Sequence, residues 1–143
     1  MYKVFFNQKP LILTNKLHEA TDKSPLVFVK YTNAALIIKA LKSKNNDKVY
    51  LYHKNIDKLW KTFVKKFPII EAAGGLVQRD DGKFLFIFRN NKWDLPKGGI
   101  EKKELTIEAA KREVTEETGL ADINVNNQLP ETYHIFKKGK NYR

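Results

Sequence analysis

The most chemically specific segment of the chain runs from Gly98 to Leu120 and reads GGIEKKELTIEAAKREVTEETGL. Glu104 follows Gly98 by six positions, and an Arg-Glu-Val triplet, a Glu pair and a Gly-Leu pair follow at short fixed intervals. Hard cations such as Mg²⁺ take oxygen ligands and usually combine one or two carboxylates with substrate phosphates. The segment therefore predicts a divalent-cation site that acts on a phosphate-bearing substrate.

A short helix must position these carboxylates. Thr106 is expected to cap a helix that begins at Ile107, and Gly119 is placed to end it in a left-handed conformation. Helical spacing places Ile107, Ala110 and Val114 on one apolar stripe. We expect this stripe to be the buried side of the helix.

The acidic side of the same helix carries Glu113, Glu116 and Glu117 within one narrow arc. Like charges at these spacings cost roughly 0.2–0.5 kcal/mol per pair, so a cation should compensate them. Arg112 is spaced to brace a carboxylate, and the small side chain of Ala109 would leave room for a hydrated metal and substrate. The alternative is an ordinary solvated acidic face, which the fixed offsets of the glycines and the arginine disfavour.

The loop in front of the helix follows a strand expected at Phe84 to Arg89 and contains two adjacent glycines. A carbonyl such as that of Gly98 can complete the coordination of a metal, and Lys97 can offer a charge to phosphate or remain a solvated lysine. Arg89 is the second candidate for substrate binding. Trp93 is expected to be a core or loop-packing aromatic.

With Gly98, Glu104, Arg112-Glu113-Val114, Glu116-Glu117 and Gly119-Leu120 all in place, the segment resembles the complete signature of the Nudix hydrolases. The resemblance implies an enzyme that uses Mg²⁺ or Mn²⁺ to split a pyrophosphate linkage in a nucleoside diphosphate joined to another group. It assigns catalytic roles to Arg112, Glu113, Glu116 and Glu117, and metal binding to Gly98, Glu104, Glu113, Glu116 and Glu117. The general base stays open between Glu113 and a later acid, Asp122 or Glu131.

The run WDLPKGGIEKKE is similar to the Nudix branch that hydrolyses dinucleoside polyphosphates and diphosphoinositol polyphosphates. A phosphate-rich small molecule is therefore the favoured substrate. Two alternatives stay open: a nucleotide-sensing module on a Nudix fold, and an RNA 5′-pyrophosphohydrolase whose basic first half attracts RNA.

Composition narrows the class of protein. The 143 residues contain no cysteine, which excludes disulfides and thiolate metal sites and fits a reducing cytoplasm. There is no long apolar run and no signal-like N-terminus, so we expect a cytoplasmic protein without a membrane span. The net charge of +11 is uneven, since residues 1–68 hold 14 lysines against 4 acids. Apolar residues at helical spacing favour a solvated outer face for these lysines over an RNA surface.

Two domains are expected, a small basic α/β module at 1–68 and a Nudix domain at 69–143 with an α/β/α sandwich and a mixed sheet. The Nudix domain looks shortened at its C-terminus, and an uncovered sheet edge in a complete chain would favour a homo-oligomer. Expected strands before the signature are Tyr2–Phe6, Leu11–Thr14, Leu26–Tyr31, Val49–His53, Ile69–Gln78 and Lys83–Arg89. Expected helices there are Ala34–Leu41 and Ile56–Phe67, and one strand is expected after the signature near Thr132–Lys137.

Overall fold

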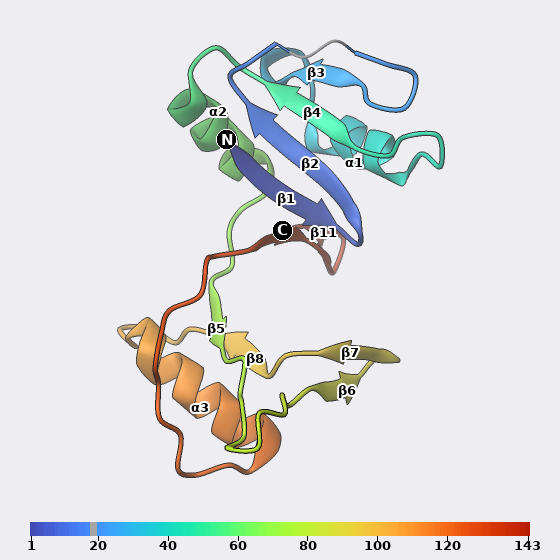
Figure 1. Ribbon diagram of the computed structural model, residues 1–143. Coiled ribbons are helices and arrows are strands. Elements are labelled where there is room, and N and C mark those ends of the chain that lie inside the picture. The colour runs from blue at the N-terminus through green and yellow to red at the C-terminus, as the bar shows by residue number, and fades with distance from the viewer. Residues whose placement is uncertain (18–19) are drawn as a thin grey trace. The chain divides into compact units, whose positions relative to one another are not determined.

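The computed structural model describes residues 1–17 and 20–143 (Figure 1). Three α-helices and a mixed β-sheet confirm the expected α/β class. The chain forms two compact units: residues 1–69 together with 130–143 make the first, and residues 70–129 make the second. Within the described residues, no helix is both long enough and apolar enough to cross a membrane.

The first unit is built on a five-stranded mixed sheet with strand order β3-β4-β2-β1-β9. β1 and β2 are antiparallel, whereas β4 is parallel to both β2 and β3, and β9 is parallel to β1. Its strands are β1 (Tyr2–Phe6), β2 (Lys9–Thr14), β3 (Leu26–Phe28), β4 (Val49–Tyr52), β9 (Tyr133–Ile135), β10 (Lys137–Lys138) and β11 (Asn141–Tyr142). Its helices are α1 (Ala34–Lys42), α2 (Ile56–Lys66) and the single 3₁₀ turn η1 (Val29–Tyr31).

Alternation along the central strands, broken at Thr14 of β2, buries one face of this sheet. Val4 pairs with Leu11, which in turn pairs with Val49, so these three buried side chains lie on the same face. α1 and α2 supply the rest of the core through buried residues that include Ile37, Leu41, Leu59 and Phe63. A period of two in the strands and of 3.6 in the helices thus specifies a two-layer unit.

Asparagine side chains begin both helices of the first unit. Asn33 accepts a hydrogen bond from the Leu36 N–H at 2.9 Å, and Asn55 accepts one from the Lys58 N–H at 2.8 Å. The strands and helices expected in this unit are present with small shifts at their ends. The main difference is that β3 stops at Phe28, after which residues 29–31 turn into η1.

The second unit contains α3 and two pairs of short strands. β5 (Ala72–Gly74) pairs with β8 (Lys97–Gly99), and β6 (Ile87–Arg89) pairs with β7 (Lys92–Asp94), both antiparallel. The β6–β7 turn places Asn90 at φ 51° and Asn91 at φ 58°, the left-handed conformations that a two-residue type I′ hairpin needs and that asparagine tolerates. α3 (Thr106–Thr118) packs on β5 and β8.

The long hairpin expected between Ile69–Gln78 and Lys83–Arg89 is present only near its tip. The Leu85 N–H donates to the Val77 carbonyl at 2.9 Å, and Gly82 turns the chain at φ 83°. Toward the base, β5 instead pairs with β8 and β6 with β7. The β5–β8 and β6–β7 pairings therefore replace most of the expected ladder.

α3 ends as expected but begins one residue early. Gly119 has φ 76° and ends the helix, whereas Thr106 is already helical and Leu105 is the N-cap residue, which offers no side-chain cap. The Glu108 carboxylate accepts from the Leu105 N–H at 3.1 Å, a different bond from the one expected of a Thr106 cap. The stripe predicted at Ile107, Ala110 and Val114 is wrong in part. Ala109 and Val114 are buried and Ile107 is half exposed, because the helix is rotated toward β5 and β8.

The boundaries of the compact units differ from the expected domains at one place. Both divide the chain near residue 69, but the structure assigns residues 130–143 to the first unit because β9 pairs with β1. The mixed sheet likewise lies in the first unit and not in the second. The domain division at 1–68 and 69–143 stays a prediction.

Replacing Gly74 with alanine should weaken the contact of β5 with β8. The added Cβ would lie 2.1 Å from the Pro96 carbonyl oxygen and 2.5 Å from the Lys97 Cβ, too close for backbone to tolerate. We expect a loss of about 1–3 kcal/mol in the free energy of unfolding, measured by urea denaturation, with faster hydrogen exchange in β8 and α3. Gly99→Ala is the matched control, since nothing lies within 4 Å of the place that its methyl group would take. Equal stability of the two variants would contradict the prediction.

Candidate functional site

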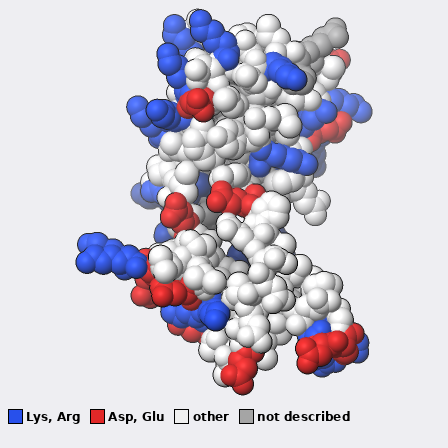
Figure 2. Space-filling view, turned by 60° about the vertical axis from the view of Figure 1, so that its left-hand side comes forward, with Lys and Arg blue, Asp and Glu red and all other residues white. Residues whose placement is uncertain are grey.

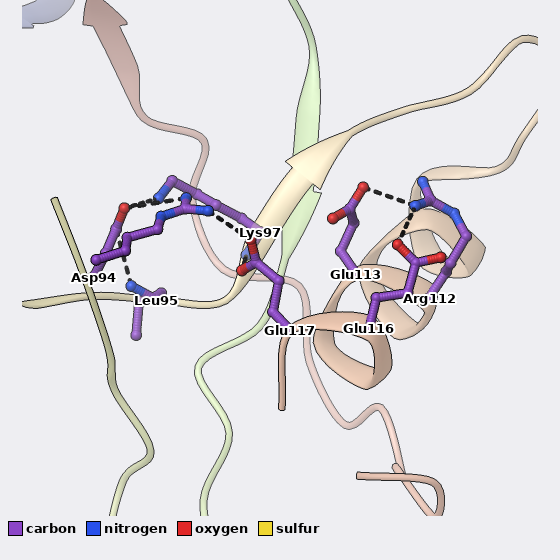
Figure 3. Close-up of polar contacts among 8 residues, drawn as sticks. Asp94, Leu95, Lys97, Arg112, Glu113, Glu116 and Glu117 are labelled. Carbon is purple, nitrogen blue, oxygen red and sulfur yellow. Dashed lines mark hydrogen bonds and ion pairs between the residues drawn. The ribbon is translucent and has the colours of Figure 1, made fainter. Parts of the chain in front are cut away.

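Arg112 is the centre of the polar network on α3 (Figure 3). Its Nε and Nη2 donate to the two carboxylate oxygens of Glu104 at 2.8 and 2.9 Å, a two-point contact. Nη1 donates to Glu113 at 2.7 Å and to Glu116 at 3.3 Å, and Nη2 also donates to the Gly99 carbonyl at 2.9 Å. One guanidinium therefore joins the loop, β8 and the acidic side of the helix.

Glu113 lies directly against the glycine backbone of β8. A Cβ on Gly98 would be 2.0 Å from Oε2 of Glu113, so a side chain there would push the carboxylate off its bond to Arg112. The Glu113 side chain is only 13% exposed. The glycine of the signature thus serves close approach of the carboxylate, since its backbone conformation does not require glycine.

Glu117 belongs to a second polar cluster with Arg89 and Lys97. The Arg89 guanidinium donates to Oε1 of Glu117 at 2.5 Å, and the Lys97 backbone N–H donates to Oε2 at 2.9 Å. Both oxygens of Glu117 are thereby fixed, one by a side chain from β6 and the other by the backbone of β8. The glutamates that share one arc of α3 are held by two different arginines.

Asp94 links the two candidate phosphate-binding side chains, a role that the sequence did not predict. Its carboxylate accepts from Lys97 Nζ, from Arg89 Nη2 at 3.3 Å and from the Leu95 N–H at 2.9 Å. Burial raises the pKa of Asp94, but the hydrogen bond and charge of Lys97, with smaller contributions from Leu95 and Arg89, bring it below its ordinary value. The only signal in the sequence was its place between Trp93 and the glycine loop.

Glu104 is the carboxylate most strongly affected by Arg112. The two-point hydrogen bond from Arg112, together with the bond from the Glu101 N–H at 2.8 Å, lowers the pKa of Glu104 from 4.5 to about 2. The hydrogen bonds and charges of Glu104, and then of Glu113, raise the pKa of Arg112. Glu104 is therefore a carboxylate held ionised by its partner, at the loop that precedes the helix.

The predicted site residues lie together in the second unit. The donor set of Glu104, Glu113, Glu116 and Glu117, with the carbonyls of the glycine loop, has the hard oxygen chemistry that fits Mg²⁺ or Mn²⁺. Their carboxylates do not converge, however: across residues 1–17 and 20–143, no three acidic or imidazole side chains are grouped as a metal site requires. Arginine pairing divides the cluster, so the metal and catalytic roles stay predictions.

The structure also bears on the roles expected of Ala109, Trp93 and Glu131. Ala109 is fully buried under the helix, so it does not provide room for metal or substrate. Trp93 contacts the Phe88 ring, with centroids 5.1 Å apart, but remains 71% exposed, so it packs locally on the β6–β7 hairpin and not in a core. Glu131, a candidate base, accepts from the Tyr133 hydroxyl at 2.8 Å in the first unit.

The sequence that forms this site matches a known family. A family model described as NUDIX domain matches residues 68–141, just over half of the chain. The chain belongs to the Nudix family, which confirms the resemblance seen in its signature. Hydrolases of this family generally use divalent metal ions.

Individual relatives show the same likeness. An uncharacterized 17.7 kDa protein from the e-segB intergenic region of Enterobacteria phage T4 is 42% identical over 80 residues, which cover 48% of this chain and 52% of the phage protein. The RNA pyrophosphohydrolase of Bartonella tribocorum is 44% identical over 73 residues, covering 43% of this chain and 42% of that enzyme. The RNA pyrophosphohydrolase of Halorhodospira halophila is 41% identical over 55 residues, covering 37% and 30%.

These matches cover about half or less of each relative. The chain spans at most about half the length of the curated relatives that it matches, the largest share being 52%. No solved structure matches the chain.

Arg112→Lys should release the pKa of Glu104. Because the folded-state pKa lies below 4.5, the pair adds stability above about pH 4.5 and loses it as the pH falls toward about 2. A lysine cannot make the two-point contact, so we expect Glu104 to titrate closer to 4.5 and the acid-dependent loss of stability to shrink. An NMR titration of the Glu104 carboxyl carbon measures the first effect, and thermal unfolding from pH 6 to pH 2 measures the second.

Arg79→Lys is the matched control for this variant. Arg79 pairs with Asp81 on the exposed tip of the second unit and has no contact with Glu104. It should leave the Glu104 titration unchanged. A Glu104 pKa that stays near 2 in Arg112→Lys would show that Arg112 is not its cause.

Proposed function

We propose that this protein is a metal-dependent pyrophosphohydrolase that acts on the 5′-triphosphate end of RNA. The observation that supports hydrolase activity is that carboxylate and cationic side chains lie close together around β8. Glu113 and Glu117 supply oxygen donors against the glycine loop, and Arg89 and Lys97 supply positive charge beside them. Oxygen donors for a hard cation next to cations for phosphate are what hydrolysis of a phosphoanhydride needs.

Each side chain has a role in this proposal. Glu113, Glu116 and Glu117 would hold the cation, which when bound lowers the pKa of coordinated water and neutralises charge on the bridging oxygens. Arg112 orients Glu113 and Glu116, while Arg89 and Lys97 exchange carboxylate partners for substrate phosphate. Water attacks phosphorus, one phosphoanhydride P–O bond breaks, and pyrophosphate departs. The RNA then carries a 5′-monophosphate. Glu113 is the candidate to take the proton of the water.

Two observations favour RNA as the substrate. Two of the relatives described above, each more than 40% identical over its matched segment, are named RNA pyrophosphohydrolase. The first unit carries 18 basic against 5 acidic residues, a net charge of +13, whereas the second carries 9 against 11. A polyanion gains more from such a charge than a small nucleotide does. Dinucleoside and diphosphoinositol polyphosphates, which the loop sequence favours, are the competing substrates.

Glu117→Gln should abolish most of the hydrolysis. The amide keeps the shape of the side chain but loses the charge that a divalent cation requires, so we expect turnover to fall more than about 100-fold. Product release is measured with Mg²⁺ and with Mn²⁺. Glu108→Gln is the matched control on α3, because its carboxamide oxygen can still accept from the Leu105 N–H. Retained turnover in Glu117→Gln would remove Glu117 from the site.

A substrate panel separates the candidate functions. We expect faster pyrophosphate release from 5′-triphosphate RNA than from diadenosine polyphosphates, diphosphoinositol polyphosphates, ADP-ribose or nucleoside triphosphates. A substrate longer than a mononucleotide should also respond more steeply to salt. Preference for a dinucleoside polyphosphate would overturn RNA as the substrate. Tight binding of a nucleotide without turnover would favour the sensing function over the enzyme.

A further inference from the structure

The sheet of the first unit has a second face that neither α1 nor α2 covers. Buried Val4, Leu11 and Leu51 point to the helices, so their neighbours along each strand point to the other side. Within the described residues of this unit, α1 and α2 lie on the same side of the sheet (Figure 1), and their buried side chains join the core on the first face. The two helices therefore leave this second face uncovered, although Thr14, which lies on it opposite Tyr52, is buried.

This open face carries aromatic side chains and a lysine. Register places Phe5 opposite His134 and Phe28 opposite Tyr52, and Lys3 lies opposite Ile12 between these two pairs. None of these side chains is buried, and Phe28 is 45% exposed. We refer to Lys3, Phe5, Ile12, Phe28, Tyr52 and His134 as the open-face platform. No acidic side chain occupies these positions.

The rings of the platform already take part in stacking and cation–π contacts. The Phe5 and His134 rings stack with centroids 5.7 Å apart, and Lys3 Nζ lies 5.0 Å above the Phe5 ring. Phe28 meets Tyr52 edge to face at 5.2 Å. Strand spacings place the nearest members of the two pairs, Phe5 and Tyr52, about 16 Å apart, obliquely across the sheet. A ligand that contacts both aromatic pairs must span this distance and must carry planar groups that can stack on the rings.

The charge of the first unit selects an anionic ligand. Its net charge of +13 is spread over its surface, where lysine and arginine predominate (Figure 2). Across residues 1–17 and 20–143, the ion pairs between side chains all lie in the second unit, so no carboxylate neutralises the lysines of the first through such a pair. A long ligand with flat faces and a charged backbone is a single-stranded nucleic acid.

We propose that the open-face platform binds single-stranded RNA, with bases stacked on the Phe5–His134 and Phe28–Tyr52 pairs and Lys3 on the backbone between them. The choice of RNA over DNA rests on the function proposed for the second unit. The binding itself needs neither a 5′ triphosphate nor a metal. In this role the first unit would bind the RNA chain, whereas hydrolysis at the 5′ end of the RNA belongs to the second unit.

Fluorescence anisotropy of a labelled single-stranded RNA tests this binding. The RNA carries a 5′-hydroxyl group and the buffer contains a chelator, so the hydrolytic site contributes nothing. Phe28→Thr keeps a strand-forming residue and should weaken binding on the order of ten- to a hundred-fold. Tyr31→Thr is the matched control, because Tyr31 is exposed in the same unit but lies outside the sheet, and it should change binding less than about two-fold.

A second pair of variants does not disturb the strands. Lys3→Gln should lower the dependence of log affinity on log salt by about 0.7, the value for one lost phosphate contact on a single strand. Lys61→Gln on the exposed side of α2 is its control. A rival location on this unit is a cavity of about 550 Å³ lined by Lys39, Lys42 and Lys66 among others. Lys39→Gln with Lys42→Gln tests that location.

The outcomes separate this proposal from the proposed hydrolysis. Binding of 5′-hydroxyl RNA that falls in Phe28→Thr and Lys3→Gln supports the platform, even if no substrate is hydrolysed. Loss of binding only in the cavity variant, or equal effects of Phe28→Thr and Tyr31→Thr, would overturn it. Failure of the wild-type protein to bind RNA would overturn it too and leave the face to a protein partner. Equal binding of DNA would overturn the choice of RNA.

Discussion

The guanidinium of Arg112 is the interaction on which the acidic helix depends. α3 gathers several carboxylates on one side, and their mutual repulsion would weaken the helix unless positive charge met them. Arg112 meets Glu104, Glu113 and Glu116 and also takes the Gly99 carbonyl, so it ties the helix to the loop before it. Loss of the arginine would leave partly buried carboxylates unpaired and would release the glycine loop from the helix at the same time.

The signature predicted the chemistry of the site better than its contacts. Spacing on a helix was enough to bring the glutamates to one side and to end α3 at Gly119. It could not show that Glu117 pairs with Arg89, or that Asp94 joins Arg89 to Lys97, because those contacts depend on how β6, β7 and β8 pair. The burial of Ala109 could not be predicted from spacing either. Ala109 lies on the acidic arc of α3, yet it is buried because α3 packs on the short strands.

The elements of the first unit were more predictable than those of the second. Its strands alternate clearly between buried and exposed residues, and asparagine caps mark both helices, so local pattern and tertiary structure agree. The second unit has strands of three residues, and its buried apolar residues are few, with Ala73, Ala109 and Val114 among them. Short strands have weakly specified partners, which explains why the expected hairpin was replaced by β5–β8 and β6–β7 pairing.

The pairing of β9 with β1 has a consequence for biosynthesis. Val4 and Tyr133 are partners although 129 positions separate them, so the edge of β1 stays open until the ribosome has passed the whole second unit. At about 5–20 residues per second, translation from residue 69 to residue 133 takes roughly 3–13 s. During that interval the nascent sheet exposes a pairing-competent edge strand. Synonymous codons that slow translation across residues 70–129 would lengthen the time in which nascent chains on one messenger can associate through that edge.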